Sequence, residues 1–240
     1  MRKILVLQHI EIEDLGIIEN FFKKSKSDVH YIKLHKNEKI PINLDQFKMM
    51  ISLGGPMDTW MEEDYPWLIE EKKIIKKFVM ELEKPFLGIC LGCQLLGEIV
   101  GGTVIRSKNP EIGFYKIKLN KEALVDDVFC NFPKNFFVFQ WHSYEVANLS
   151  NPNVKILGNS KSKAIQLFKY KNHAYGMQFH IEINKNTIRK WSSNLDYLKT
   201  LKKRFGSNPI EKLELQQRDK LIEMRKLCQE LIKKISTQDG

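Results

Sequence analysis

A cysteine between two glycines is the group in this sequence best suited to chemistry. Residues 88–92, Gly-Ile-Cys-Leu-Gly, place Cys90 after a short apolar run and before a helical pattern at residues 93–100. Flanking glycines allow a sharp strand-to-helix turn that leaves a nucleophile uncrowded. The helix N-terminus behind Cys90 would favour the thiolate and present free N–H groups to an oxyanion. The pattern predicts a nucleophile, with a buried structural cysteine as the alternative.

Two further clusters could serve this cysteine. His180 follows a predicted strand, and Glu182 lies two residues later. Such a histidine can act as the base for a cysteine while the carboxylate orients its ring. Gly54-Gly55-Pro56 follows another predicted strand, and a Gly-Gly pair there can turn a backbone N–H into an oxyanion hole. Taken alone, the two clusters also fit a surface histidine with a chance neighbour and a plain strand-to-helix turn.

The elements that would position these groups alternate along the first part of the chain. Short β-branched or apolar runs at residues 4–7, 29–34, 49–53 and 86–89 alternate with helical patterns at residues 15–24, 66–82 and 93–100. Strand candidates then follow one another at residues 103–106, 113–119, 136–141, 154–159, 164–170 and 174–179. Helical patterns return at residues 185–204 and, beyond residue 209, to about residue 235. Alternating strands and helices imply parallel pairing, with helices on both faces of a sheet.

Together the three clusters resemble the class I glutamine amidotransferases, whose glutaminase domain joins a Gly-Gly-Pro loop, a G-x-C-x-G-x-Q segment and a late His-x-Glu. The counterparts here are residues 54–56, 88–94 and 180–182, in the family's order, within a match from about residue 4 to residue 183. Within the family the chain looks most like stand-alone proteins similar to the glutaminase half of GMP synthase. The segments that support this are Gly55-Pro56-Met57, Tyr65-Pro66-Trp67-Leu68, Gln140-Trp141-His142-Ser143 and Tyr175-Gly176-Met177-Gln178-Phe179-His180. Many relatives have proline where this chain has Ile181, which leaves the His-x-Glu spacing intact.

The resemblance implies a flavodoxin-like three-layer α/β sandwich with a mostly parallel central sheet. It makes Cys90 the nucleophile, His180 the general base and acid, and Glu182 the residue that orients His180. The other implied site residues are the oxyanion-hole donors Gly55 and Leu91, and the substrate-binding residues Gly54, Gln94, Ser143 and Tyr144. No cofactor and no metal are implied.

The implied reaction is attack of the thiolate on a γ-glutamyl amide, release of ammonia and hydrolysis of a thioester. Glutamine and other γ-glutamyl conjugates both fit as substrates, and the ammonia could pass to a separate synthetase subunit. A different class of function stays open, in which the same fold serves as a regulatory module without catalysis.

Three rival chemistries explain less of the sequence. Cys90-x-x-Cys93 at a strand–helix junction also resembles a thioredoxin-like redox pair. That interpretation leaves Gly54-Gly55-Pro56 and the His-x-Glu unexplained. A zinc site would need a second pair of ligands at suitable spacing, which the sequence lacks. A cysteine variant of an α/β-hydrolase would normally carry its acid before its histidine along the chain.

Composition narrows the class of protein and its partners. With 42% hydrophobic residues in 240, the chain can bury a core, and none of its apolar runs reaches the ~20 residues of a membrane span. The net charge is +10, and residues 185–240 hold 14 of the 39 basic residues but also 7 of the 29 acidic ones. The signs are mixed, and no aromatic residue is interleaved with the charges after Phe205, which argues against nucleic-acid binding. Four cysteines are too few for a disulfide framework, which favours a cytoplasmic setting.

We expect two parts, a glutaminase domain at residues 1–184 and a helical extension at residues 185–240. The extension carries an apolar stripe in which residues recur every three or four positions: Leu221, Met224, Cys228, Leu231 and Ile235. Such a stripe would pack on the glutaminase domain or on a second copy of the chain in a homodimer.

Overall fold

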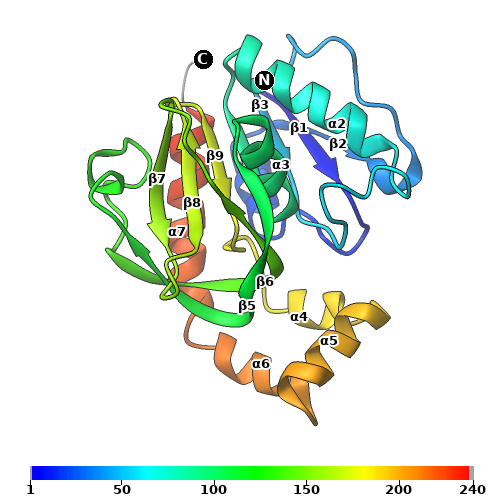
Figure 1. Ribbon diagram of the computed structural model, residues 1–240, viewed down its shortest axis with the longest axis vertical. Helices are drawn as coiled ribbons and strands as arrows, with labels where there is room; N and C mark the ends of the chain where they lie inside the picture. Colours follow the sequence, from blue (N-terminus) through cyan, green and yellow to red (C-terminus); the bar gives the residue numbers. More distant parts are fainter. Residues whose placement is uncertain (1, 238–240) are drawn as a thin grey trace.

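The computed structural model describes residues 2–237, which fold around a nine-stranded sheet of order β2-β1-β3-β4-β9-β8-β7-β5-β6 (Figure 1). The strands are β1 (Lys3–Gln8), β2 (Asp28–Lys33), β3 (Met49–Ser52), β4 (Phe86–Ile89), β5 (Thr103–Leu119), β6 (Asn135–Ala147), β7 (Val154–Asn159), β8 (Ile165–Tyr170) and β9 (Ala174–Met177). The helices are α1 (Ile18–Lys24), α2 (Trp67–Lys76), α3 (Leu91–Ile99), α4 (Thr187–Trp191), α5 (Leu195–Phe205), α6 (Pro209–Gln217) and α7 (Leu221–Ser236).

The predicted α/β class is confirmed, and the sheet divides into two halves. Strands β2, β1, β3, β4 and β9 pair in parallel, as expected for strands joined by helical crossovers. From β9 to β6 the neighbouring strands pair antiparallel. The two strands expected at residues 103–106 and 113–119 are one strand, β5, which bulges away from β6 between Arg106 and Glu111. A bulge leaves one strand locally unpaired, and this one lies opposite Ser143.

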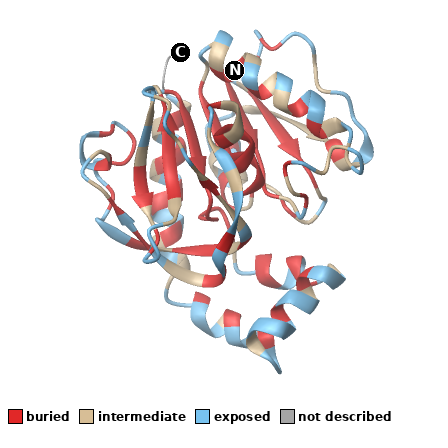
Figure 2. Ribbon diagram, in the orientation of Figure 1, coloured by how far each residue is buried: buried red, intermediate tan, exposed pale blue. Residues whose placement is uncertain are grey.

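Side-chain alternation along the buried strands divides the core into two layers. On β1, Ile4 and Val6 pack in the layer with α1 and α7, whereas Leu5 and Leu7 pack in the layer with α2 and α3. Figure 2 shows the strands buried and the outer faces of the helices exposed. The parallel half of the sheet is therefore the middle of a three-layer sandwich.

The C-terminal residues form four helices where the sequence indicates two helical stretches. The first stretch breaks at residues 192–194, and the Asn194 side chain accepts hydrogen bonds from the amides of Asp196 and Tyr197 at the start of α5. The second breaks at residues 218–220, between α6 and α7. Four of the five residues of the predicted stripe on α7 are buried against the layer that contains α1, behind strands β7 to β9 (Figure 1), and the fifth, Leu221, is partly buried there. Whether residues 1–184 and 185–240 are separate domains stays a prediction.

No helix within residues 2–237 combines the length and the apolar character that crossing a membrane requires.

Candidate active site

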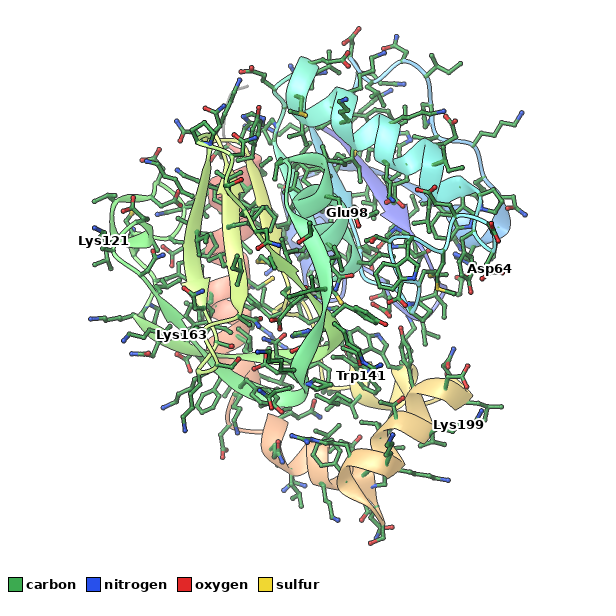
Figure 3. All side chains as sticks on the ribbon, in the orientation of Figure 1. Asp64, Glu98, Lys121, Trp141, Lys163 and Lys199 are labelled. Atoms are coloured by element: carbon green, nitrogen blue, oxygen red, sulfur yellow. The ribbon has the colours of Figure 1, made fainter. Side chains whose placement is uncertain are left out.

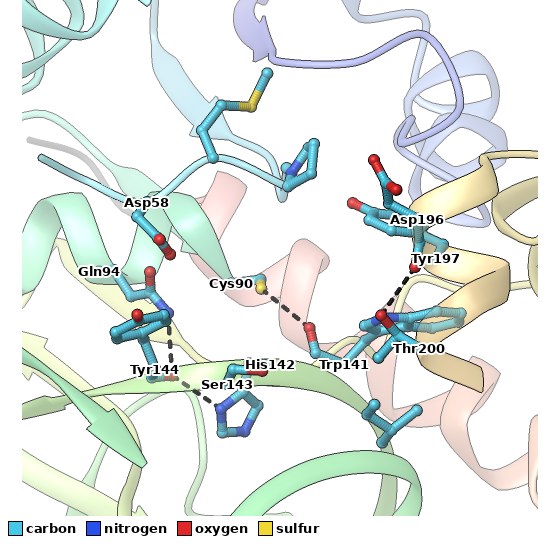
Figure 4. Close-up of a pocket in the computed structure, with 14 residues that line it drawn as sticks. Asp58, Cys90, Gln94, Trp141, His142, Ser143, Tyr144, Asp196, Tyr197 and Thr200 are labelled. Carbon is cyan, nitrogen blue, oxygen red and sulfur yellow. Dashed lines mark hydrogen bonds between the residues drawn. The ribbon is translucent and has the colours of Figure 1, made fainter. Parts of the chain in front are cut away.

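The carboxyl ends of the parallel strands bring the predicted site residues to one edge of the sheet. Strands β1, β3, β4 and β9 are neighbours, so the segments that follow them meet. Ligands of open parallel sheets bind at this edge. Here a cleft of about 300 Å³ lies over Cys90, between the loop after β3, strand β6 and helix α5 (Figure 4).

Cys90 occupies a strained turn between β4 and α3. Its backbone has φ +51° and ψ −100°, and its N–H donates to the carbonyl oxygen of Met177 at 2.8 Å. A non-glycine residue in such a conformation costs roughly 1–3 kcal/mol and is typical of functional sites. The flanking glycines are required by close approach: a Cβ on Gly92 would lie 2.2 Å from the Ser52 carbonyl oxygen, and one on Gly88 would lie 2.4 Å from that of Gly92. The turn therefore presents a single side chain, the Cys90 thiol, to the cleft.

His180 and Glu182 lie beside Cys90, just beyond β9. His180 Nδ1 donates to Glu182 Oε1 at 2.6 Å, and Glu182 Oε2 accepts from the N–H of Ile181 at 2.9 Å. The carboxylate therefore has a partner for each oxygen. Burial of His180 opposes its protonation, but the charges and hydrogen bonds of Glu182 and Cys90 outweigh burial and hold the His180 pKa well above 6.5. The ring is thus placed to receive and hold a proton next to the thiol.

Two backbone N–H groups near Cys90 lack a hydrogen-bond partner within the part of the chain that the structure describes. Gly55 lines the cleft, and a Cβ built on it would lie 3.2 Å from the Leu91 side chain. Leu91 is the first residue of α3, where backbone N–H groups lack intrahelical acceptors. Neither of these two N–H groups forms a hydrogen bond within residues 2–237. Both are available to bind an oxygen atom of a ligand.

The predicted substrate-binding residues are placed differently from one another. Gln94 lines the cleft, but its amide nitrogen donates to the Tyr144 carbonyl oxygen at 3.1 Å and to Gln178 at 3.2 Å. The Tyr144 carbonyl oxygen also accepts from His142, so its acceptor capacity is used within the chain. Ser143 lines the cleft opposite the β5 bulge. Gly54 is not among the cleft-lining residues, and a Cβ built on it would lie 2.2 Å from Glu13 Oε2 and 3.0 Å from His180 Cε1.

Helix α5 forms one wall of the cleft, which the sequence did not indicate. Asp196, Tyr197 and Thr200 line it, and the Tyr197 and Trp141 rings lie 5.1 Å apart between centroids. Figure 3 shows Trp141 where the sheet faces this helix. No local pattern in residues 195–205 marks them as site residues, because only packing of the C-terminal helices against β6 brings them there.

Three buried polar side chains near Cys90 were also missed by sequence reasoning. Gln178 donates from its amide nitrogen to Cys90 Sγ at 3.7 Å. Glu13 is hydrogen-bonded to the Tyr197 hydroxyl, and burial raises the pKa of Glu13 even though His180 and Tyr197 act in the opposite direction. His9 contacts the Gly54 carbonyl oxygen. Their position in the sequence could have indicated them as site residues, because each follows the carboxyl end of a parallel strand. His9 and Glu13 lie in the segment after β1, and Gln178 directly follows β9.

The second cysteine of the C-x-x-C pair lies in the other layer of the core. Cys93 packs with the residues under α2 and α3, whereas Cys90 belongs to the layer with α1 and α7. Burial, reinforced by Cys90, raises the pKa of the Cys93 thiol well above 9. Residues 2–237 contain no cluster of three or more His, Cys, Asp or Glu side chains that could hold a metal.

Most of the chain is similar to known proteins in sequence and in structure. The family model for glutamine amidotransferase class-I matches residues 12–192. A subunit of the glutamine-hydrolysing GMP synthase from Ignicoccus hospitalis is 33% identical, over 70% of this chain and 85% of the relative. Gamma-glutamyl peptidase 4 from Arabidopsis thaliana is 26% identical, over 80% of this chain and 76% of the relative. The crystal structure of a Thermotoga maritima glutamine amidotransferase covers 99% of both chains, with a TM-score of 0.88 and 31% identity.

Proposed function

Because this chain belongs to the class I glutamine amidotransferase family, we propose that it hydrolyses γ-glutamyl amides through Cys90, His180 and Glu182. The observation that carries the proposal is the constellation at the carboxyl edge of the sheet. A thiol on a strained turn lines the cleft, a histidine bonded to a buried carboxylate lies beside that thiol, and the nearby N–H groups of Gly55 and Leu91 have no partner within residues 2–237. Acyl transfer to a thiol requires a nucleophile, a base that activates it and donors that stabilise the oxyanion, and these groups would supply all three.

The proposed reaction has two stages. His180 takes the Cys90 proton as sulfur attacks the γ-carbonyl carbon, and the carbonyl oxygen becomes an oxyanion held by the N–H groups of Gly55 and Leu91. His180 then protonates the leaving nitrogen, the C–N bond breaks, and a γ-glutamyl thioester remains on Cys90. A water molecule, deprotonated by His180, hydrolyses the thioester to glutamate and restores the thiol. Removing one such N–H donor typically costs roughly 2.7–4 kcal/mol of transition-state stabilisation.

The two ends of the cleft fit the two ends of a γ-glutamyl substrate. Figure 4 places Asp58 and Gln94 on one side of Cys90, and Trp141, Tyr197 and Thr200 on the other. The Asp58 side chain makes no hydrogen bond or ion pair within residues 2–237, so its carboxylate is free to bind an α-ammonium group. Ser143, on the cleft wall, would hold the α-carboxylate through its backbone N–H. The glutamyl part would therefore lie on the Asp58 side.

The leaving group would lie on the side of α5. The His180 ring packs against Trp191 at 4.8 Å, and Trp191 contacts both Trp141 and Tyr197. Since His180 must protonate the departing nitrogen, that nitrogen faces the same side. Ammonia needs no room beyond His180, yet the cleft continues between β6 and α5. This observation favours γ-glutamyl conjugates, whose amines would fill that space, as a second candidate substrate beside glutamine.

A partner that accepts ammonia remains part of the proposal for glutamine. One relative is a subunit of a GMP synthase, and another is named as a γ-glutamyl peptidase. With a partner subunit, glutaminase activity would rise when the partner is present. Without one, the isolated chain would reach its full rate alone.

Ammonia or amine release from glutamine and from γ-glutamyl dipeptides, measured with the purified chain, tests the proposal. Cys90→Ala should abolish turnover, whereas Cys93→Ser, the matched control, should keep most of it because the Cys93 thiol is buried away from the cleft. A glutamine analogue with an electrophilic carbon at the amide position should label Cys90 alone. Equal losses in both variants, without labelling, would favour a redox pair. No turnover and no labelling in the wild type would favour a regulatory module.

A second pair of variants separates the two substrates. Thr200→Trp would fill the space between β6 and α5 and should lower kcat/KM for γ-glutamyl dipeptides at least ten-fold while leaving glutamine turnover nearly unchanged. Lys199→Trp is the control, because Lys199 lies on the same helix, is 76% exposed and does not line the cleft. An equal effect of Thr200→Trp on both substrates would remove the second candidate.

A further inference from the structure

A buried ion pair lies directly beneath the Gly54–Gly55 peptide. The side chains of His9 and Glu71 are fully buried, and His9 Nε2 lies 2.9 Å from Glu71 Oε1 and 3.0 Å from Oε2. The other ring nitrogen, Nδ1, lies 3.0 Å from the carbonyl oxygen of Gly54. Ser52 donates to Glu71 Oε1 at 2.9 Å, so the carboxylate is held from two directions. None of these side chains lines the cleft.

The partners of His9 determine where its protons lie. A carbonyl oxygen can only accept a hydrogen bond, so Nδ1 must carry a proton. The Glu71 carboxylate also accepts, so Nε2 carries a proton as well and the ring is an imidazolium. Burial of His9 works against this charge, but the Glu71 charge and hydrogen bond outweigh burial and raise the His9 pKa above 6.5. An ion pair at this depth brings little net stability compared with apolar packing, which is a reason to look for a positional role.

The geometry of the Gly54–Gly55 peptide bond links the His9–Glu71 pair to the cleft. In a trans peptide the C=O and N–H groups point in opposite directions, and no cis peptide occurs within residues 2–237. While His9 holds the Gly54 carbonyl oxygen, the N–H of Gly55 must point away from His9. Two glycines around this bond would otherwise let the peptide rotate easily, because glycine accepts most backbone conformations. No other donor within residues 2–237 bonds to the Gly54 carbonyl oxygen.

We propose that the His9–Glu71 pair positions the oxyanion hole by holding the Gly54–Gly55 peptide with the Gly55 N–H turned toward the substrate. The proposal rests on the proposed function, because it assigns a role within that reaction. The loop lies in contact with His9, since a Cβ built on Gly55 would lie 2.8 Å from the His9 Cβ. A positively charged donor on the Gly54 carbonyl also polarises the peptide, which makes the Gly55 N–H a stronger donor. His9 is therefore a positioning residue that acts through Gly55.

Two substitutions at His9 separate this role from a role in folding. The amide nitrogen of asparagine can occupy the place of Nδ1, so His9→Asn keeps the donor to Gly54 and loses the contact with Glu71. The amide of glutamine reaches the place of Nε2, so His9→Gln keeps a donor to Glu71 and loses the one to Gly54. We expect His9→Asn to be the less stable variant yet to keep kcat within about five-fold of wild type. His9→Gln should fold more stably, but its kcat should fall roughly 10- to 100-fold with little change in KM. This loss is smaller than the roughly 100- to 1,000-fold loss in kcat expected when a hole donor is removed completely, because the Gly55 N–H is still present.

Binding of a glutamate γ-aldehyde gives a readout that does not depend on turnover. This aldehyde adds the Cys90 thiol and forms an oxyanion in the hole, whereas glutamate binds without one. His9→Gln should weaken aldehyde binding by about the factor lost in kcat and leave glutamate binding unchanged. Activity that follows melting temperature, with His9→Gln more active than His9→Asn, would overturn the positioning role. Absence of both turnover and aldehyde binding in the wild type would overturn the proposed function, and this inference with it.

Discussion

Helix α7 packs into the core of the molecule. Shortening one side chain on its buried face should therefore show whether the packing of this helix stabilises the fold. Leu231 is fully buried among residues of the layer that contains α1, whereas Ile222 on the same helix is 67% exposed. Replacing a fully buried leucine by alanine costs about 2–5 kcal/mol, through lost transfer energy and the cavity left behind. That is a large share of the roughly 5–15 kcal/mol by which domains are stable. Ile222→Ala should change stability by less than about 0.5 kcal/mol.

Urea unfolding followed by circular dichroism would test this expectation. With an m-value of about 3 kcal/mol/M for a chain of this size, Leu231→Ala should lower the midpoint by roughly 0.7–1.7 M. Alanine is a good helix former at both positions, so helix propensity does not explain a difference between the variants. Equal midpoints for the two variants would refute the packing of α7 on the sheet. The extension would then be a free arm, and binding to a second copy or to another partner would be the better explanation of its apolar stripe.

Three further predictions concern the site. The His9 pKa is raised in the folded state, so protonated His9 stabilises the fold fully below its unfolded pKa of about 6.5, and this contribution is lost as the pH rises through the higher folded pKa. The urea midpoint of the wild type should therefore fall between pH 6.5 and pH 9. The midpoint of His9→Gln should fall less steeply over the same range. Tyr197→Phe removes the hydroxyl bonded to buried Glu13 and should cost about 1–3 kcal/mol and lower turnover; unchanged melting and turnover would show that this bond is dispensable. Gly92→Ala would place a Cβ 2.2 Å from the Ser52 carbonyl oxygen, so α3 must shift. We expect the free energy of unfolding to fall by about 1–3 kcal/mol and most activity to be lost. Full activity would contradict the close approach of the turn to β3.

Features that depend on short spacings could be predicted from the amino-acid sequence alone. Alternating strand and helix patterns predicted the α/β class because burial on both faces of a parallel sheet leaves a local signature. The glycines around Cys90 and the His180-x-Glu182 spacing marked the candidate chemistry, since a sharp turn and a bonded pair two residues apart are both local arrangements. That these three side chains meet was expected from the family resemblance, and it follows physically from β4 and β9 being parallel neighbours.

The support of the candidate site and the walls of its cleft depend on contacts between residues far apart in the sequence. His9 bonds to Gly54 across 45 residues and to Glu71 across 62, and spacings of that size carry no periodic signal in the sequence. Helix α5 reaches the cleft because the helical stretch predicted at residues 185–204 breaks at Asn194, which turns the chain back over β6. Local propensity indicates that a segment is helical, but the direction it takes is set by what it packs against. The proposed support of the oxyanion hole and the proposed space for a leaving group therefore depend on the tertiary fold.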